Sequence, residues 1–134
     1  MTIKVVPHTV LPTGSACSLI TQRQLAGLLG SSTFQTLEAG AHACSWLGSV
    51  GTVELTYGPS NWSYIKQWFA HDACGNQAAT YQGGVGSKAL TCPGGIDVLS
   101  GDTGVELSTG NLTPTPSLAI LTSLAKYILD ELGL

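Results

Sequence analysis

The chain has 134 residues, of which 43% are hydrophobic and only 10% are charged, and its formal net charge is -3. This apolar content and low net charge exclude an intrinsically disordered chain. The Lys and Arg residues stand singly along the sequence, so no basic stripe exists for nucleic acid. The length suits one compact domain. We expect residues 1–14 to form an extended lead-in and residues 15–134 to form a single α+β domain.

Four cysteines stand in a small chain that is rich in Gly, Ser and Thr and poor in Lys. An even number of cysteines in such a chain is typical of an exported domain closed by disulfides. Three pairings exist, and we predict the sequential one, Cys17 with Cys44 and Cys74 with Cys92. It closes loops of about 28 and 19 residues, each contributing roughly 3 kcal/mol. The alternatives are four buried reduced thiols, or a zinc site of which only one half, His71 and Cys74, is visible; we predict neither metal nor cofactor.

The first residues lack the basic start, the apolar run and the cleavage site of a signal peptide. No stretch of the sequence is long and apolar enough to span a membrane. If the protein is exported, we expect the given sequence to be its mature part. The predicted location is then extracytoplasmic, either secreted or lipid-anchored after removal of a signal segment.

The first elements in chain order are a short helix and a hairpin. Residues 21–29 carry leucines at helical spacing, with Thr21 as the expected N-cap. Alternating apolar and polar residues then predict an antiparallel hairpin with arms at 42–47 and 52–57, joined by a turn at 48–51.

A second helix is expected to begin at residues 59–61 and to end near Gly75. Trp62, Ile65 and Phe69 follow each other at helical spacing. They predict an apolar stripe that belongs to the core.

Short apolar runs separated by glycines predict three or four strands within residues 81–109. A third helix follows from residue 116 or 117 to residue 132, with Thr115 as cap and Pro116 in the first turn. Its expected buried face consists of Leu118, Leu121, Ala125, Ile128, Leu129 and Leu132.

The order of these elements is helix, two strands, helix, several strands, helix. The connections between consecutive strands are too short for crossovers, which indicates antiparallel pairing. The predicted fold class is therefore α+β: an antiparallel β-sheet with three helices packed on it and two disulfides.

The sequence contains no pattern that assigns a reaction. No serine stands in a Gly-x-Ser-x-Gly elbow. His42 lies on a predicted strand, where we expect a structural or exposed imidazole. His71 lies near the end of the second helix, where the helix dipole favours a cation. No catalytic residue is predicted.

The acidic residues do not form a recognisable pair either. We expect Glu54 and Glu106 to be solvent-facing charges, since nothing in the sequence distinguishes them from other surface carboxylates. Asp97 and Asp102 lie in a Gly-rich stretch without the spacing of a calcium loop, which we interpret as a hairpin turn.

The aromatic residues carry the one functional signal. Tyr64 and Trp68 lie off the expected buried stripe of the second helix, and Tyr81 follows that helix. Aromatic side chains that are not buried can line a binding cleft. Trp68, Tyr64 and Tyr81 are therefore the candidate ligand-binding residues.

Four segments resemble one known family. They are Ala16-Cys-Ser-Leu-Ile-Thr, Leu25-Ala-Gly-Leu-Leu-Gly, Cys44-Ser-Trp and Gly83-Gly-Val-Gly-Ser-Lys-Ala-Leu. Together with the C-terminal helix they look like the actinobacterial secreted proteins and lipoproteins called domain of unknown function 3558, over about residues 15 to 132. The resemblance implies an α+β fold, an envelope location and a disulfide between Cys17 and Cys44. It implies no activity, and the family more often has an acidic residue where Ser87 stands.

Three functions are compatible with these observations. The first is a non-catalytic extracytoplasmic domain that binds a ligand or a protein partner at the cell envelope. The second is a small secreted enzyme with a histidine or carboxylate site. The third is a structural or assembly module without a small ligand. We expect the first.

Overall fold

The computed structural model of the chain describes residues 16–20, 22–29, 34–38, 42–48, 51–72, 79–109, 112 and 115–134. The expected lead-in at 1–14, the expected cap Thr21, residues 49–50 of the expected turn at 48–51, and Cys74 lie outside these ranges; Gly48 and Gly51 themselves belong to strands.

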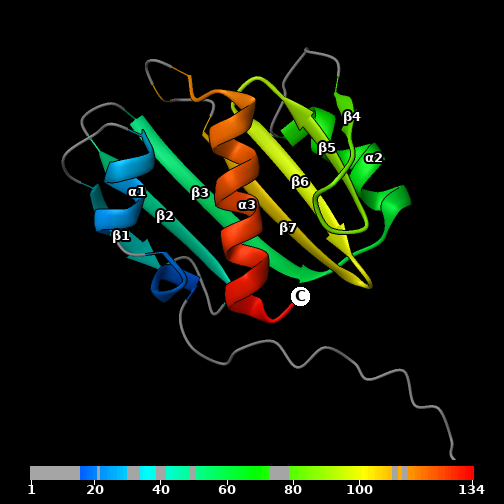
Figure 1. The fold of residues 1–134 in the computed structure, drawn as a ribbon, viewed down its shortest axis with the longest axis horizontal. Helices are drawn as coiled ribbons and strands as arrows, with labels where there is room; N and C mark the ends of the chain where they lie inside the picture. Colours follow the sequence, from blue (N-terminus) through cyan, green and yellow to red (C-terminus); the bar gives the residue numbers. More distant parts are fainter. Residues whose placement is uncertain are drawn as a thin grey trace, which may run out of the picture.

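Within these ranges, four helical segments and seven strands make up the fold (Figure 1). The helical segments are η1 (Ala16–Ser18), α1 (Gln22–Leu29), α2 (Trp62–Asp72) and α3 (Leu118–Leu132). The strands are β1 (Phe34–Glu38), β2 (Ala43–Gly48), β3 (Gly51–Pro59), β4 (Thr80–Gln82), β5 (Lys88–Cys92), β6 (Gly95–Ser100) and β7 (Thr103–Ser108). The predicted α+β class with three α-helices on an antiparallel sheet is confirmed.

The strands form one antiparallel sheet in the order β1-β2-β3-β7-β6-β5-β4. Consecutive strands pair within two meanders, β1 to β3 and β4 to β7. The two meanders join where β3 pairs with β7, with Leu55 opposite Leu107. The hairpin expected from alternation is β2 with β3, and the four strands after it match the expected number.

One face of the sheet carries the main core. Strands β3, β6 and β7 direct alternate apolar side chains to this face. Helix α3 lies across β6 and β7, η1 lies against β1 and β2, and α1 lies against β1 (Figure 1). The largest fully buried side chains of this core include Trp46, Leu55, Leu107, Leu121 and Ile128. Because a half-buried strand needs an apolar residue at every second position, the alternation seen in the sequence sets the register of this face.

Helix α3 begins one residue later than the sequence suggested. Ser117 is its N-cap: the backbone there is extended, and Ser117 Oγ accepts a hydrogen bond from Ile120 N at 3.3 Å. Thr115 and Pro116 precede the helix, so the predicted cap is wrong by two residues. Gly133 closes the other end with a left-handed φ of 75°.

The buried face of α3 is as predicted except at its first turn. Leu118 is 44% exposed, because the helix only begins there and its first turn extends past the edge of the core. The other five predicted residues are buried, and Leu124, which was not predicted, is buried as well. None of the helices in the described part of the chain is long and apolar enough to cross a membrane.

The described helices cover the opposite face of the sheet only in part. Helix α2 packs on β5 and β6, where Ile65 and Phe69 meet Cys92 and Leu99 in a second, smaller apolar cluster. The outward residues of β2, β3 and β7 lie beside α2 rather than under it. We call this surface the open face; it consists of Ser45, Leu47, Glu54, Thr56, Glu106 and Ser108.

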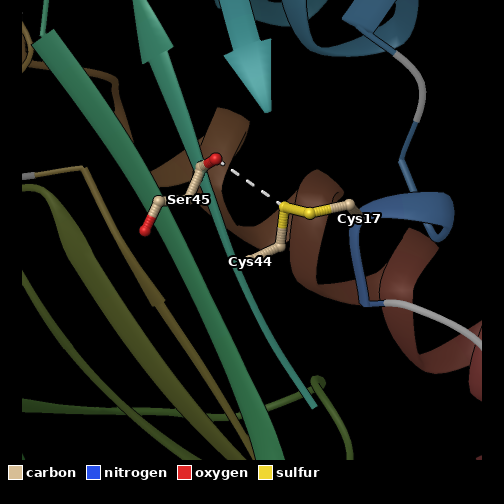
Figure 2. Close-up of a disulfide and its surroundings, with 3 residues drawn as sticks. All are labelled: Cys17, Cys44 and Ser45. Atoms are coloured by element: carbon tan, nitrogen blue, oxygen red, sulfur yellow. Dashed lines mark hydrogen bonds between the residues drawn. A yellow bond between two sulfur atoms is a disulfide. The ribbon is translucent and has the colours of Figure 1, made fainter. Parts of the chain in front are cut away.

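A disulfide between Cys17 and Cys44 ties η1 to β2, as predicted (Figure 2). The two Cα atoms are 5.1 Å apart, and Cys44 is fully buried. Cys92 is disulfide-bonded as well, while its predicted partner Cys74 lies outside the described ranges. The structure thus describes one of the two expected bridges.

Candidate functional site

Helix α2 positions the aromatic residues that the sequence singled out. Asn61 caps the helix, because Tyr64 N donates a hydrogen bond of 2.9 Å to Asn61 Oδ1. Ile65 and Phe69 are buried against the sheet and fix the rotation of the helix about its axis. At about 100° per residue, Tyr64 and Trp68 then lie on one flank of α2 and Trp62 on the other.

The three candidate binding residues are exposed but belong to two separate pairs. Tyr64, Trp68 and Tyr81 are 54%, 47% and 59% exposed. Tyr64 and Trp68 lie 6.2 Å apart between ring centroids on one flank. Tyr81, on β4, packs edge-on against Trp62 at 6.2 Å on the other flank. The expectation of exposed rings is confirmed, but the structure does not bring all three into one cluster.

Trp62 is half-buried, whereas the stripe at helical spacing placed it in the core. It stands at the rim of the small cluster, where Lys88 Nζ lies 5.3 Å from the centre of its ring. The reason is its position at the first residue of α2, near the edge strands β4 and β5, where the sheet no longer covers a large ring.

A cavity of about 180 Å³ opens where the exposed flank of α2 meets the open face. We call it the carboxyl cavity. Asp97 and Glu106 line it from the sheet, and Ser60 and Tyr64 line it from the segment that enters α2. Asp97 and Glu106 face each other directly as cross-strand partners on β6 and β7.

Asp97 is buried because the chain passes close over it. Ser60 N donates a hydrogen bond of 2.8 Å to Asp102 O, which holds the entrance to α2 against the β6–β7 hairpin. A Cβ atom at Gly104 would lie 2.7 Å from Ser60 Cβ, so only glycine permits this approach. The same position is 3.9 Å from Asp97 Oδ1. Asp97 is consequently only 7% exposed.

The surroundings of Asp97 favour its neutral form. Burial and, secondarily, the negative charge of Glu106 raise the pKa of Asp97 from 3.8 to about 8. At neutral pH the site therefore combines a protonated carboxyl of Asp97, which can donate a hydrogen bond, with the carboxyl group of Glu106. Such a pair can hold a cation or a hydroxyl group, and it can exchange protons.

Asp97 corrects the sequence interpretation. It lies in the middle of β6, not in a turn; only Asp102 lies in the turn between β6 and β7. Glu106 is half-buried beside it rather than a freely solvated charge, whereas Glu54 is exposed as expected. The signal that could have found Asp97 is its place between Ile96 and Val98, since a charge inside an apolar strand run points to a buried carboxyl.

Among the described residues, no histidine lines this cavity, although His42 contacts one of its lining residues, Tyr57. His42 stacks on Tyr57 with 4.7 Å between ring centroids, next to the main core. Burial raises the pKa of the Tyr57 hydroxyl. Neither this hydroxyl nor Trp46 Nε1 has a hydrogen-bond partner among the described residues. The side chain of His71 is outside the described part.

A second cavity of about 350 Å³ lies at the other end of the sheet, between β4, β5 and the start of α3. Its lining includes Thr91, Pro93 and Leu118 and no charged side chain. Although it is larger, it brings no titratable groups together. We therefore take the carboxyl cavity as the candidate site.

Within the described ranges, no three His, Cys, Asp or Glu side chains are grouped so as to hold a metal ion. Comparison of the chain with family models, with curated proteins and with solved structures finds no match. The proposal of a function therefore depends on the geometry of the carboxyl cavity and its surroundings.

Proposed function

We propose that this chain is a binding domain of the cell envelope that takes a ligand on the open face of its sheet, beside α2. The observation that carries the proposal is the incomplete cover of that face. A sheet face left uncovered would ordinarily be a plain polar surface, but here it ends in a cavity with a buried carboxyl. Exposed Tyr64 lines this cavity, and the ring of Trp68 lies 6.2 Å from that of Tyr64. Convergent polar groups with aromatic walls are the usual makeup of ligand sites.

The location outside the cytoplasm rests on the cysteines and on the family resemblance. The Cys17–Cys44 bridge is the kind of bond that persists in oxidising compartments. The resemblance to the actinobacterial secreted proteins and lipoproteins of domain of unknown function 3558 supports the same location. We include in this proposal the second bridge between Cys74 and Cys92, which peptide mapping without reduction will identify.

The shape of the site favours a ligand over a flat protein interface. The buried centre of a protein interface is rich in apolar and aromatic side chains and poor in charges. The open face has Leu47 as the one large apolar side chain among its residues and carries Glu54 and Glu106. The carboxyl cavity instead takes a polar group, and the Tyr64–Trp68 pair offers an adjoining apolar wall.

NMR titration of the oxidised, ¹⁵N-labelled protein tests the proposal with three probes: 1,4-diaminobutane, a disaccharide of N-acetylglucosamine, and decanoate. We expect at least one probe to shift the amides of β3 and β7 together with the indole N–H of Trp68. Tyr64→Ala should remove those shifts. Tyr81→Ala, which deletes an equally exposed ring on the other flank of α2, should leave them unchanged. Shifts confined to the cavity at β4, β5 and α3, or none with any probe, would contradict the proposal.

The carboxyl pair favours one second candidate, a small hydrolase that uses Asp97 as general acid. A carboxyl whose pKa is raised to about 8, beside another carboxyl group, is an arrangement suited to proton transfer at neutral pH. Chromogenic glycosides and esters test it: turnover that both Asp97→Asn and Glu106→Gln abolish would support an enzyme, and lack of turnover with all of them would leave the binding role.

A further inference from the structure

We propose that the carboxyl cavity recognises a cation, a primary ammonium or a guanidinium group, held by Asp97 and Glu106 beside Tyr64. This inference rests on the proposed function, because it names the class of ligand that the open face takes.

The state of Asp97 is the first argument. Its side chain is more than nine-tenths buried, it lines the cavity, and no donor among the described residues makes a hydrogen bond to its carboxyl. The fully buried polar atoms without a partner in the described part of the chain are Trp46 Nε1 and Tyr57 OH, so the oxygens of Asp97 still open onto the cavity, where a donor can reach them. A donor brought by a ligand would supply that partner, and a cationic donor would make the strongest such bond.

The chain's own described lysines are directed elsewhere. Lys88 Nζ lies over the ring of Trp62, on the far flank of α2. Lys66 is exposed, and its helical position is on the same far flank as Trp62. Lys126 belongs to α3, which covers the other face of the sheet. None of these three therefore neutralises Asp97.

The size and rim of the cavity fit a head group. Sites for whole drug-sized molecules have about 300–1,000 Å³. The carboxyl cavity has about 180 Å³, which accommodates an ammonium or guanidinium group while the rest of the ligand extends over the open face. Tyr64 at its rim offers an aromatic face, to which cations bind favourably. Exposed Glu54, on the neighbouring β3, adds a further negative charge to the same face.

Binding of a cation should release a proton. The charged or titratable groups that line the cavity with Asp97 are Glu106 of β7, Tyr57 of β3 and Tyr64 of α2, and Glu54 lies beyond them on β3; β5 opposes Asp97 with Leu90. No described positive charge is among them. A cation in the cavity would favour the ionised form of Asp97, so the affinity should rise with pH, by up to about tenfold per pH unit below the pKa of the free site.

Isothermal titration calorimetry on the oxidised protein tests the inference with two sources of the cation. One source is a free amine, 1,4-diaminobutane or agmatine; the other is the tripeptide Gly-Lys-Gly with blocked ends. The matched neutral probes are 1,4-butanediol and the same tripeptide acetylated at the lysine side chain. We expect the cationic probes to bind and the neutral ones not to bind. The ratio of the affinity for the free amines to that for the lysine tripeptide shows whether a small amine or a peptide side chain is the preferred cation.

Variants localise the binding. Asp97→Asn, which preserves shape, and Glu106→Gln should each weaken the cation at least about tenfold. Asp130→Asn, which removes an exposed carboxylate from α3, should change nothing. Should Asp97→Asn fail to fold, Glu106→Gln and the buffer dependence of the wild-type binding heat, which reports proton release, decide the question.

Two results would overturn the inference. One is an affinity for the cations that Asp97→Asn, Glu106→Gln and Asp130→Asn affect equally. The other is the absence of cation binding. If the disaccharide or decanoate still shifts the open face in the NMR titration, only the cation inference fails; if no probe reaches that face, the proposed function fails with it.

Discussion

The two faces of the sheet differ in how they are covered. Helices α1 and α3 with η1 cover one face, and its residues form a large, continuous apolar core. In the part of the chain that the structure describes, the other face carries one helix, α2, with a small apolar cluster beneath it and a polar surface beside it. Asp97 belongs to the second face, where it is buried without a hydrogen-bond partner among the described residues.

This difference indicates a division of roles between the faces. We call the face covered by α1, α3 and η1 the α3 face and the opposite one the α2 face. Burial of apolar surface is the main favourable term in folding, so most of the stability should come from the α3 face. The α2 face keeps features that do little to stabilise the fold. Tyr64 and Trp68 are exposed, and burial of the Asp97 carboxyl next to Glu106 opposes its ionisation. Features of that kind are concentrated at functional sites.

The largest loss of stability expected from one substitution is on the face of the sheet that α3 covers. Leu121→Ala should lower the free energy of unfolding by roughly 2–5 kcal/mol, because Leu121 is fully buried on the sheet-facing side of α3 and truncation of its side chain leaves a cavity. Urea denaturation measures the change. Lys126→Ala, on the exposed side of the same helix, is the control and should cost no more than about 0.5 kcal/mol. Equal effects of the two changes would show that α3 is peripheral.

The disulfide should contribute somewhat less. Replacing Cys17 and Cys44 together by alanine frees η1 from β2 and should lower the free energy of unfolding by about 3 kcal/mol, since the bridge closes a loop between residues separated by 27 positions. Urea denaturation of the variant and of the oxidised wild type gives the difference. An unchanged midpoint would show that the packing of Ala16 and Ile20 holds η1 without the bridge.

Asp97 should make stability depend on pH on the α2 face. Its carboxyl loses its proton at about 3.8 in the unfolded chain and at about 8 in the folded one, so between these values the folded state binds more protons. The free energy of unfolding should then fall as the pH rises from about 4 to about 8, by up to about 1.4 kcal/mol per pH unit. Asp97→Asn should abolish this part of the slope, measured by urea denaturation at several pH values. Asp130→Asn should retain it, and a slope equal in all three proteins would contradict the burial of a titrating Asp97.

The smallest effect concerns the exposed flank of α2. Trp68→Ala should change the free energy of unfolding by no more than about 0.5 kcal/mol, because half of its side chain is in solvent. Trp62→Ala should cost roughly 1 kcal/mol, through loss of its edge-on contact with Tyr81. Thermal melts compare the two variants. A larger loss for Trp68→Ala would mean that Trp68 belongs to the core and would remove its support for a binding role.

Local patterns in the sequence predicted most of the elements. The periodicity of residues 117–132 predicted α3 and most of its buried face, and alternation predicted the β2–β3 hairpin. Strand β1 was not predicted as an element, because its residues gain their structure from pairing with β2. The pairing of β3 with β7 is likewise invisible to local patterns, since it joins segments far apart in the chain.

The candidate site was predictable only in part. Exposure of Tyr64 and Trp68 followed from their angle to the buried stripe of α2. The role of Asp97 did not, because its burial depends on Ser60 passing over Gly104, a contact between elements. The glycines around Asp97 suggested a turn. One of them, Gly104, instead allows Ser60 to pack closely against β7.

The junction of β3 and β7 has a consequence for how the chain folds. Each meander on its own closes only short hairpins, which form quickly. The pairing of Leu55 with Leu107 instead requires β3 to find β7 across residues 60–102, the slow, non-local step of this topology. Every strand of the α3 face depends on that step for a continuous sheet. The carboxyl cavity depends on it too, because β3 and β7 form two of its walls: the site comes into existence only when the two halves of the chain meet.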